Sequence, residues 1–188
     1  MAFGSQTDAY GEYHLDGGVL ETPRVYQATG AYGTFFFNGG TLRVSTNTYA
    51  TTFFSPPAAV IQAGGAVIDT AGFDVTVVTG LSGVGGLTKV GLGTLTLGGA
   101  SSYAGPTLVT EGKLVLGVNH ASSTGITVSD GATLGLSVAT AGTTVQISSA
   151  TLGNGGTATL EALFDGGQGN PTAPAGHFNS LTLNGTVK

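Results

Sequence analysis

Short runs in which apolar side chains alternate with small or polar ones recur along this chain, and they are densest between residues 85 and 117. In the run Thr94–Leu97, the two leucines face one side of an extended backbone and the two threonines face the other. Similar runs cover residues 87–90, 107–110 and 114–116, and glycines separate them. Glycine adopts the positive φ angles of sharp turns and weakens helices. The pattern therefore predicts many short strands joined by tight turns.

The same glycine-led strand starts recur at intervals of 19 to 29 residues, with markers at Gly18, Gly40, Gly65, Gly86, Gly112, Gly131, Gly156 and Gly185. Intervals of this length suit one solenoid coil per repeat, in which stacked coils share a continuous core. Asn or Asp precedes several turn glycines, for example in Asn38-Gly39 and Asp130-Gly131, and such pairs also occur in the hairpins of antiparallel sandwiches. The regular spacing favours the parallel solenoid.

Composition supports an all-β chain. Glycine accounts for 34 of 188 residues and charged residues for only 8%, against about 25% in typical domains. The hydrophobic share of 40% is too high for a disordered chain. We expect one domain over residues 1–188, in which residues 1–16 form either an irregular N-terminal cap or a strand of a truncated coil. We interpret residues 159–164 as a strand or a helical turn, and residues 165–174 as a loop excursion.

Charge and cysteine content exclude several classes of partner. The net charge is −5, and the five basic residues are scattered along the chain at Arg24, Arg43, Lys89, Lys113 and Lys188. Because binding to phosphates requires clustered Lys and Arg, we expect no nucleic-acid binding and no attraction to anionic lipid. Cysteine is absent, and no apolar run is long enough for a membrane helix, so we expect no membrane insertion of this segment. The first ten residues lack the features of a signal peptide, and the last residues read as a strand that has just begun, so we expect a fragment of a larger exported protein.

Residues 85–117, GGLTKVGLGTLTLGGASSYAGPTLVTEGKLVLG, resemble the autotransporter-associated β-strand repeat of secreted bacterial passenger domains. The family pattern is roughly G-L-T-K-x-G-x-G-T-L-T-L-x-G-x-x-x-Y-x-G-x-T-x-V-x-x-G-x-L-x-L. The positions in register are Gly86, Leu87, Thr88, Lys89, Gly91, Gly93, Thr94, Leu95, Thr96, Leu97, Gly99, Tyr103, Gly105, Thr107, Val109, Gly112, Leu114 and Leu116. The resemblance implies a right-handed parallel β-helix, here of roughly 7–9 coils, that is secreted to the bacterial cell surface. The motif is structural, and it brings no catalytic residues with it.

Aromatic residues are concentrated in the first 54 positions. Within Phe35–Phe37, a strand must turn at least one ring outward. We expect Phe35 and Phe37 to fill the core and Phe36 to pack under a loop. The alternative is an interaction surface, for which the candidate residues are Tyr26, Tyr32, Phe36, Tyr49, Phe53 and Phe54.

The sequence carries little that indicates catalysis. His14, His120 and His177 lack metal-ligand spacing, and we interpret them as loop histidines. Asp69 and Asp74 are the nearest carboxylate pair, suited to acid–base work or cation binding, but we interpret them as flanking a turn. The segment DGGQGNP at residues 165–171 only faintly resembles a calcium-binding repeat. We therefore predict a non-enzymatic protein without cofactors or metal.

Three hypotheses for function follow. The favoured one is a structural or adhesive segment of a passenger stalk. The second is a filament subunit that stacks end to end, or associates laterally, because unpaired strand edges at the ends of a solenoid template pairing with another chain. The third is a carbohydrate-binding or carbohydrate-active β-helix, with host or surface glycans as partners.

Overall fold

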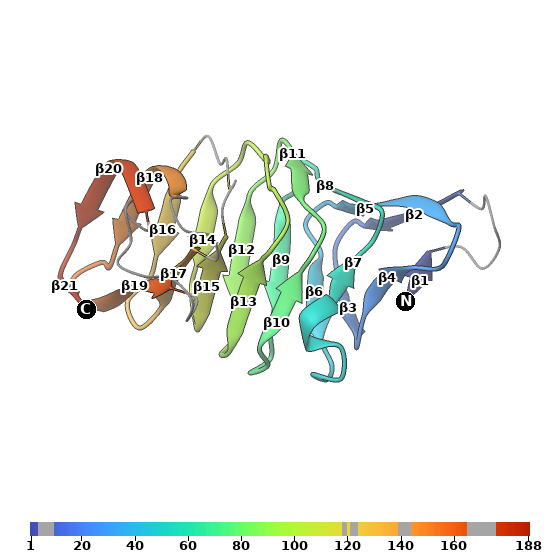
Figure 1. Ribbon diagram of the computed structural model, residues 1–188, viewed down its shortest axis with the longest axis horizontal. Helices are drawn as coiled ribbons and strands as arrows, with labels where there is room; N and C mark the ends of the chain where they lie inside the picture. The colour runs from blue at the N-terminus through green and yellow to red at the C-terminus, as the bar shows by residue number, and fades with distance from the viewer. Residues whose placement is uncertain (4–9, 118–119, 121–123, 139–143, 165–175) are drawn as a thin grey trace.

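The chain winds into a parallel β-solenoid of about seven turns, which confirms the fold class predicted from the sequence. The structure is a computed structural model that describes residues 1–3, 10–117, 120, 124–138, 144–164 and 176–188. Strands from successive turns lie side by side along the long axis, and the first and last strands lie toward opposite ends of the stack (Figure 1). Among the described residues, no helix is long and apolar enough to cross a membrane; the one helical element is the 3-10 turn η1 (Ala50–Thr52).

Three sheets run along the stack in the described part of the chain. The nine-stranded sheet consists of β1 (Ala2–Phe3), β4 (Val25–Gln27), β7 (Phe54–Ser55), β10 (Val75–Val77), β13 (Thr94–Leu97), β15 (Lys113–Leu116), β17 (Thr133–Val138), β19 (Thr157–Phe164) and β21 (Thr186–Val187). The eight-stranded sheet consists of β3 (Val19–Thr22), β6 (Thr41–Val44), β9 (Ala66–Asp69), β12 (Leu87–Val90), β14 (Thr107–Val109), β16 (Ile126–Val128), β18 (Val145–Leu152) and β20 (Gly176–Leu183). The four-stranded sheet consists of β2 (Tyr10–Leu15), β5 (Tyr32–Phe37), β8 (Ala58–Ile61) and β11 (Leu81–Gly83).

Every strand pair in the described residues is parallel and joins strands that lie one coil apart, which rules out a sandwich of hairpins. Examples are β9 with β12 and β12 with β14. Residues 1–16 contribute strands to the first coil, because β1 pairs with β4 and β2 pairs with β5. Residues 159–164 belong to strand β19 rather than to a helical turn. The predicted loop at residues 165–174 lies outside the described residues.

The glycine markers chosen from the sequence do not follow one corner of the coil throughout. Gly86 directly precedes a strand of the eight-stranded sheet, whereas Gly112 directly precedes a strand of the nine-stranded sheet. The interval between them therefore crosses from one sheet to the next, and the true coil runs from Leu87 to its register partner Thr107. In some coils turn glycines occur at more than one corner, for example Gly65 and Gly72, so glycine spacing alone misplaces the register here.

Columns of inward-facing aliphatic side chains build the core. In the eight-stranded sheet, one column in register contains Leu42, Ile68, Lys89, Val109, Val128 and Leu152. Across the interior, a column of the nine-stranded sheet contains Val75, Leu95, Leu114, Leu134 and Leu160. All of these except Leu160 are buried. Because apolar side chains of successive coils stack on one another, the apolar face of each coil is removed from water. A single coil could not bury this face alone.

The core changes character along the axis. Near the N-terminal end it is aromatic: the Phe35 ring lies 4.6 Å from that of Phe37 and 5.2 Å from that of Phe54. Beyond β11 the four-stranded sheet ends, and the backbone of residues 101–105 takes its place through hydrogen bonds such as Ala104 N–H to the Gly83 carbonyl, 2.8 Å. There Tyr103 fills the interior and its hydroxyl lies 2.6 Å from Thr107 Oγ1.

The glycine at position 105 is required by this close stacking of coils. A Cβ atom at Gly105 would lie 2.3 Å from both the Gly85 carbonyl carbon and the Gly86 nitrogen, which are backbone atoms of the preceding coil. Backbone atoms cannot give way as a flexible side chain can, so a larger residue would push two coils apart.

We expect Gly105→Ala to lower the free energy of unfolding by about 2 kcal/mol or more, since overpacking against backbone forces the coils to shift. Gly98→Ala is the matched control, because its Cβ would meet only Thr76 Cγ2 at 3.5 Å and the Val77 carbonyl at 3.6 Å. Urea unfolding followed by far-UV circular dichroism measures both. Equal stability of the two variants would contradict the proposed backbone contact.

Candidate functional site

Two of the predicted surface aromatics are part of the core instead. Phe53 and Phe54 are fully buried, so they cannot form an interaction surface of this chain. Phe35 and Phe37 are buried as expected. Phe36 does turn outward, but it stacks on the His14 ring of the neighbouring coil, with ring centroids 4.5 Å apart, rather than packing under a loop.

The outer face of β2 and β5 carries a small polar and aromatic cluster. Tyr10 and Tyr32 are register partners and are 66% and 57% exposed. Glu12 accepts a hydrogen bond of 3.0 Å from the Tyr10 hydroxyl and lies 3.3 Å from His14 Nε2. The hydrogen bonds to His14 and then Tyr10 lower the pKa of Glu12. The alternation in YGEYHL, residues 10–15, is the sequence signal that could have placed these three side chains on one face.

Tyr26 and Tyr49 form a separate group around one cation. The Arg24 guanidinium carbon lies 4.2 Å from the Tyr26 ring centre and 5.0 Å from that of Tyr49, which are cation–π distances. The surface predicted from the sequence is therefore two separate clusters, one on β2 and β5 and one around Arg24.

Asp69 and Asp74 support turns, as the turn-flanking interpretation predicts. Asp69 accepts the Ala71 N–H at 2.8 Å and lies 3.5 Å from Arg43 Nε. Asp74 accepts the Thr94 N–H at 2.7 Å from the next coil. Among the described residues, no group of three or more His, Asp or Glu side chains could hold a metal ion. The segment DGGQGNP at 165–171 lies outside the described residues.

Lys89 stands in the aliphatic column of the core and is fully buried. Its ammonium donates hydrogen bonds to Thr70 Oγ1 at 2.8 Å and to the carbonyls of Val90, Gly91 and Glu111 at 3.0, 2.6 and 3.2 Å. These partners come from three successive coils. Lys89 therefore ties three coils together at one corner, because its ammonium bonds to groups of each.

Burial lowers the pKa of Lys89 to about 8, and the negative charges of Asp69, Glu111 and Asp74 oppose this shift. The ammonium form therefore still predominates at neutral pH. A depressed lysine pKa in a cleft would suggest a nucleophile. Here the amine is enclosed and fully hydrogen-bonded, so its role is structural.

The three histidines do not all lie in loops. His14 is in β2 and His177 is in β20. His120 is 4% exposed, lies edge-on to Tyr103 at 5.5 Å, and has no hydrogen-bond partner for either ring nitrogen within the described part of the chain. Burial lowers the pKa of His120 to about 4, because an imidazolium there would lose its hydration.

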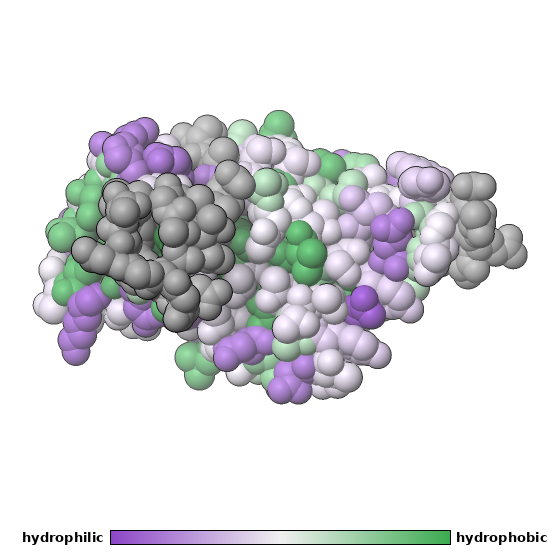
Figure 2. Space-filling view, in the orientation of Figure 1, coloured by the Kyte–Doolittle hydropathy of each residue, from purple (hydrophilic) through white to green (hydrophobic). Residues whose placement is uncertain are grey.

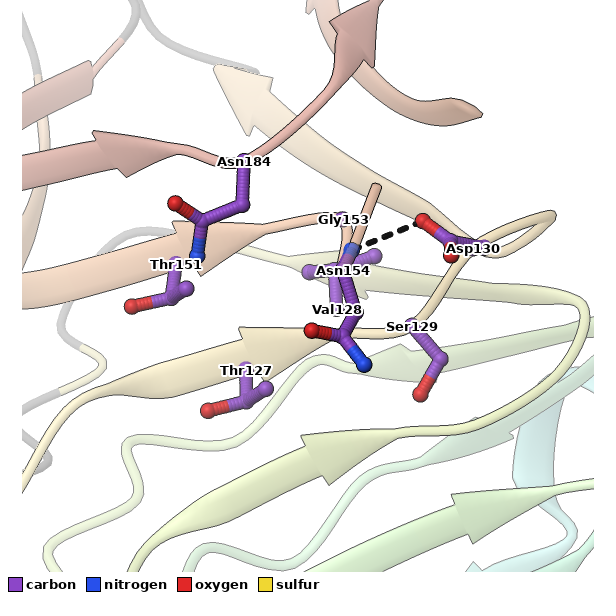
Figure 3. Close-up of a pocket in the computed structure, with 8 residues that line it drawn as sticks. All are labelled: Thr127, Val128, Ser129, Asp130, Thr151, Gly153, Asn154 and Asn184. Atoms are coloured by element: carbon purple, nitrogen blue, oxygen red, sulfur yellow. Dashed lines mark hydrogen bonds between the residues drawn. The ribbon is translucent and has the colours of Figure 1, made fainter. Parts of the chain in front are cut away.

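A groove of about 440 Å³ lies on the eight-stranded sheet near its C-terminal end. Thr127 of β16 and Thr151 of β18 are register partners on its floor, and Asn184 follows β20 (Figure 3). The rest of the lining consists of Val128, the last residue of β16, and of residues in the turns after β16 and β18: Ser129, Asp130, Gly153 and Asn154. Sequence analysis missed this groove, because its residues come from three coils. The face of the molecule drawn in Figure 2 is mostly of intermediate hydropathy, with scattered hydrophilic and hydrophobic residues, in keeping with the low content of charge.

Residues 87–116 match the family model of the passenger-associated-transport-repeat. The match covers β12 to β15, which belong to two successive coils and include Lys89, and confirms the resemblance inferred from residues 85–117. Together with the solenoid, it is consistent with an autotransporter passenger β-helix. Searches of curated proteins and of solved structures gave no match.

We expect acid to destabilise the fold through His120. Its pKa is lower in the folded chain, about 4, than the usual 6.5, so the unfolded chain binds the extra proton between these values. The contribution of neutral His120 to the free energy of unfolding is complete above pH 6.5. It is lost as the pH falls toward 4, and the loss is about 3 kcal/mol at most. Urea unfolding between pH 4.5 and 7.5 should show a steeper loss for the native chain than for His120→Phe. Parallel pH profiles for the two proteins would contradict this assignment.

Proposed function

We propose that this chain, which carries a passenger-associated transport repeat, is a structural and adhesive stalk segment of an autotransporter passenger. The observation that carries the proposal is the unbroken register of parallel strands from β3 to β20, with the matched repeat in the middle of the stack. A rod of this kind holds whatever it carries away from the cell. The repeat family implies a secreted or surface-exposed protein.

A structural role also agrees with how the ionisable groups are used. Asp69, Asp74 and Lys89 are each engaged by backbone groups of the turns they support. The repeat family is structural, which favours a passenger stalk without enzymatic activity.

Display on a bacterial surface tests this proposal. The chain is fused between a signal peptide and a reporter translocator, and external protease sensitivity and adhesion of the cells to mucin-coated plastic are measured against cells that carry the translocator alone. We expect external display and increased adhesion. Retention inside the cell would overturn the proposal of a stalk segment. Display without any gain in adhesion would overturn the proposed adhesive role.

A second function, end-to-end assembly, is favoured by the exposed apolar side chains of the last coil. Leu181 and Leu183 of β20 are register partners of the buried Ala150 and Leu152, yet they are 41% and 53% exposed. A further coil stacked on β20 would cover both leucines and would pair the outer edge of β20, which has no partner strand among the described residues. In this proposal, a second copy of the chain supplies that coil.

For the assembly proposal we expect the purified chain to form elongated oligomers whose length grows with concentration. Light scattering and negative-stain electron microscopy measure this. Leu181→Asp with Leu183→Asp should abolish the oligomers, because two carboxylates would be buried in the contact. A native chain that stays strictly monomeric at high concentration would rule out assembly.

A further inference from the structure

The groove on β16, β18 and β20 gathers polar side chains that the fold does not use. The hydroxyls of Thr127 and Thr151 and the side-chain amides of Asn154 and Asn184 make no hydrogen bond within the described part of the chain. Each amide offers one acceptor and two donors, and each hydroxyl offers both functions. In Figure 3 these side chains come from neighbouring strands and turns around one hollow.

Asp130 fixes the wall of the groove. Its Oδ1 accepts the backbone N–H of Asn154 at 2.8 Å, a bond that joins the turn after β16 to the turn after β18 (Figure 3). Gly156 permits this approach, since a Cβ there would lie 2.7 Å from the Asp130 carboxyl carbon. The groove is therefore held in shape before any ligand arrives, which reduces the entropy cost of binding.

The charge of the lining narrows the ligand class. The described residues of the lining include no Lys or Arg, and the Asp130 carboxylate would repel a phosphate, a sulfate or an acidic sugar. One carboxylate is too few for a protein-held calcium site, which takes six to eight oxygen ligands. The remaining groups are neutral donors and acceptors, and a polyhydroxylated, uncharged ligand matches them.

We propose that this groove binds a neutral saccharide, with Thr127, Thr151 and Asn184 hydrogen-bonding to its hydroxyl groups. The outward column continues from Thr127 and Thr151 to Thr182, so hydroxyls recur once per coil, about 4.8 Å apart. This ladder lets adjacent hydroxyls of a sugar find partners on successive coils. The inference deepens the adhesive part of the proposed function by naming a ligand class.

A second groove on the same sheet shows that the polar lining is not a general property of the solenoid. That groove, of about 350 Å³, is lined by Ala63, Gly64, Gly65, Ala66, Val67, Gly86, Thr88, Pro106 and Leu108. Thr88 brings the only side-chain hydroxyl among them. The groove on β16, β18 and β20 differs in having polar side chains from every coil that it crosses.

Binding is tested with the purified chain, so that a failure of surface display leaves the result unaffected. Saturation-transfer NMR and titration calorimetry are run with lactose, cellobiose, chitobiose and mannobiose, and with sialyllactose and calcium chloride as charged probes. We expect at least one neutral disaccharide to bind with a Kd of about 1 mM or lower. We expect sialyllactose to bind more weakly than lactose because of Asp130.

Thr151→Val with Asn184→Ala should weaken the binding of that disaccharide by about tenfold or more, since both side chains lose hydrogen bonds to the ligand. Asn184→Ala alone, at an exposed turn position, should weaken it by a smaller factor and provides a readout should Thr151→Val perturb the sheet. Thr96→Val with Asn47→Ala is the matched control outside the groove and should leave binding unchanged. No binding by any neutral disaccharide at about 10 mM, equal affinity in the groove variant, or tighter binding of sialyllactose or calcium would overturn the proposal.

Discussion

Backbone hydrogen bonding between successive coils is the constraint on which the whole molecule depends. Every strand donates and accepts across the stack in register, so inward and outward positions must alternate identically from one coil to the next. The coils nevertheless differ in length: Val109 pairs with Val128, whereas Leu152 pairs with Leu183. Strand length also varies, from three residues in β14 and β16 to eight in β18 and β20, and the parallel pairing of neighbouring coils is kept throughout.

Local rules explain why much of the fold could be predicted from the sequence. The period of two in TLTL placed Leu95 and Leu97 in the core, and the family resemblance fixed the parallel arrangement. The same period could not predict that Phe53 and Phe54 are both buried, because neighbours in a strand face opposite sides. Phe53 precedes β7 at a corner, where the backbone turns and both rings reach the interior.

Sites that form only when successive coils stack could not be predicted from the sequence. The partners of Lys89 come from the coils before and after it, at Thr70 and Glu111, and no local motif joins them. The groove brings Thr127, Thr151 and Asn184 together over coils of unequal length. Glycine markers that change from one corner to another could not supply that register. Knowledge of which residues stack is needed first.

The scarcity and placement of the basic residues have a consequence for proteolysis. Trypsin cleaves only after Lys and Arg, and three of the five lie in strands paired on both sides: Arg43 in β6, Lys89 in β12 and Lys113 in β15. A protease must bind its substrate as an extended strand, which these paired segments cannot provide until neighbouring coils separate. Digestion at these positions would therefore report the opening of the stack itself, and an intact rod would pass through a protease-rich environment with few vulnerable bonds.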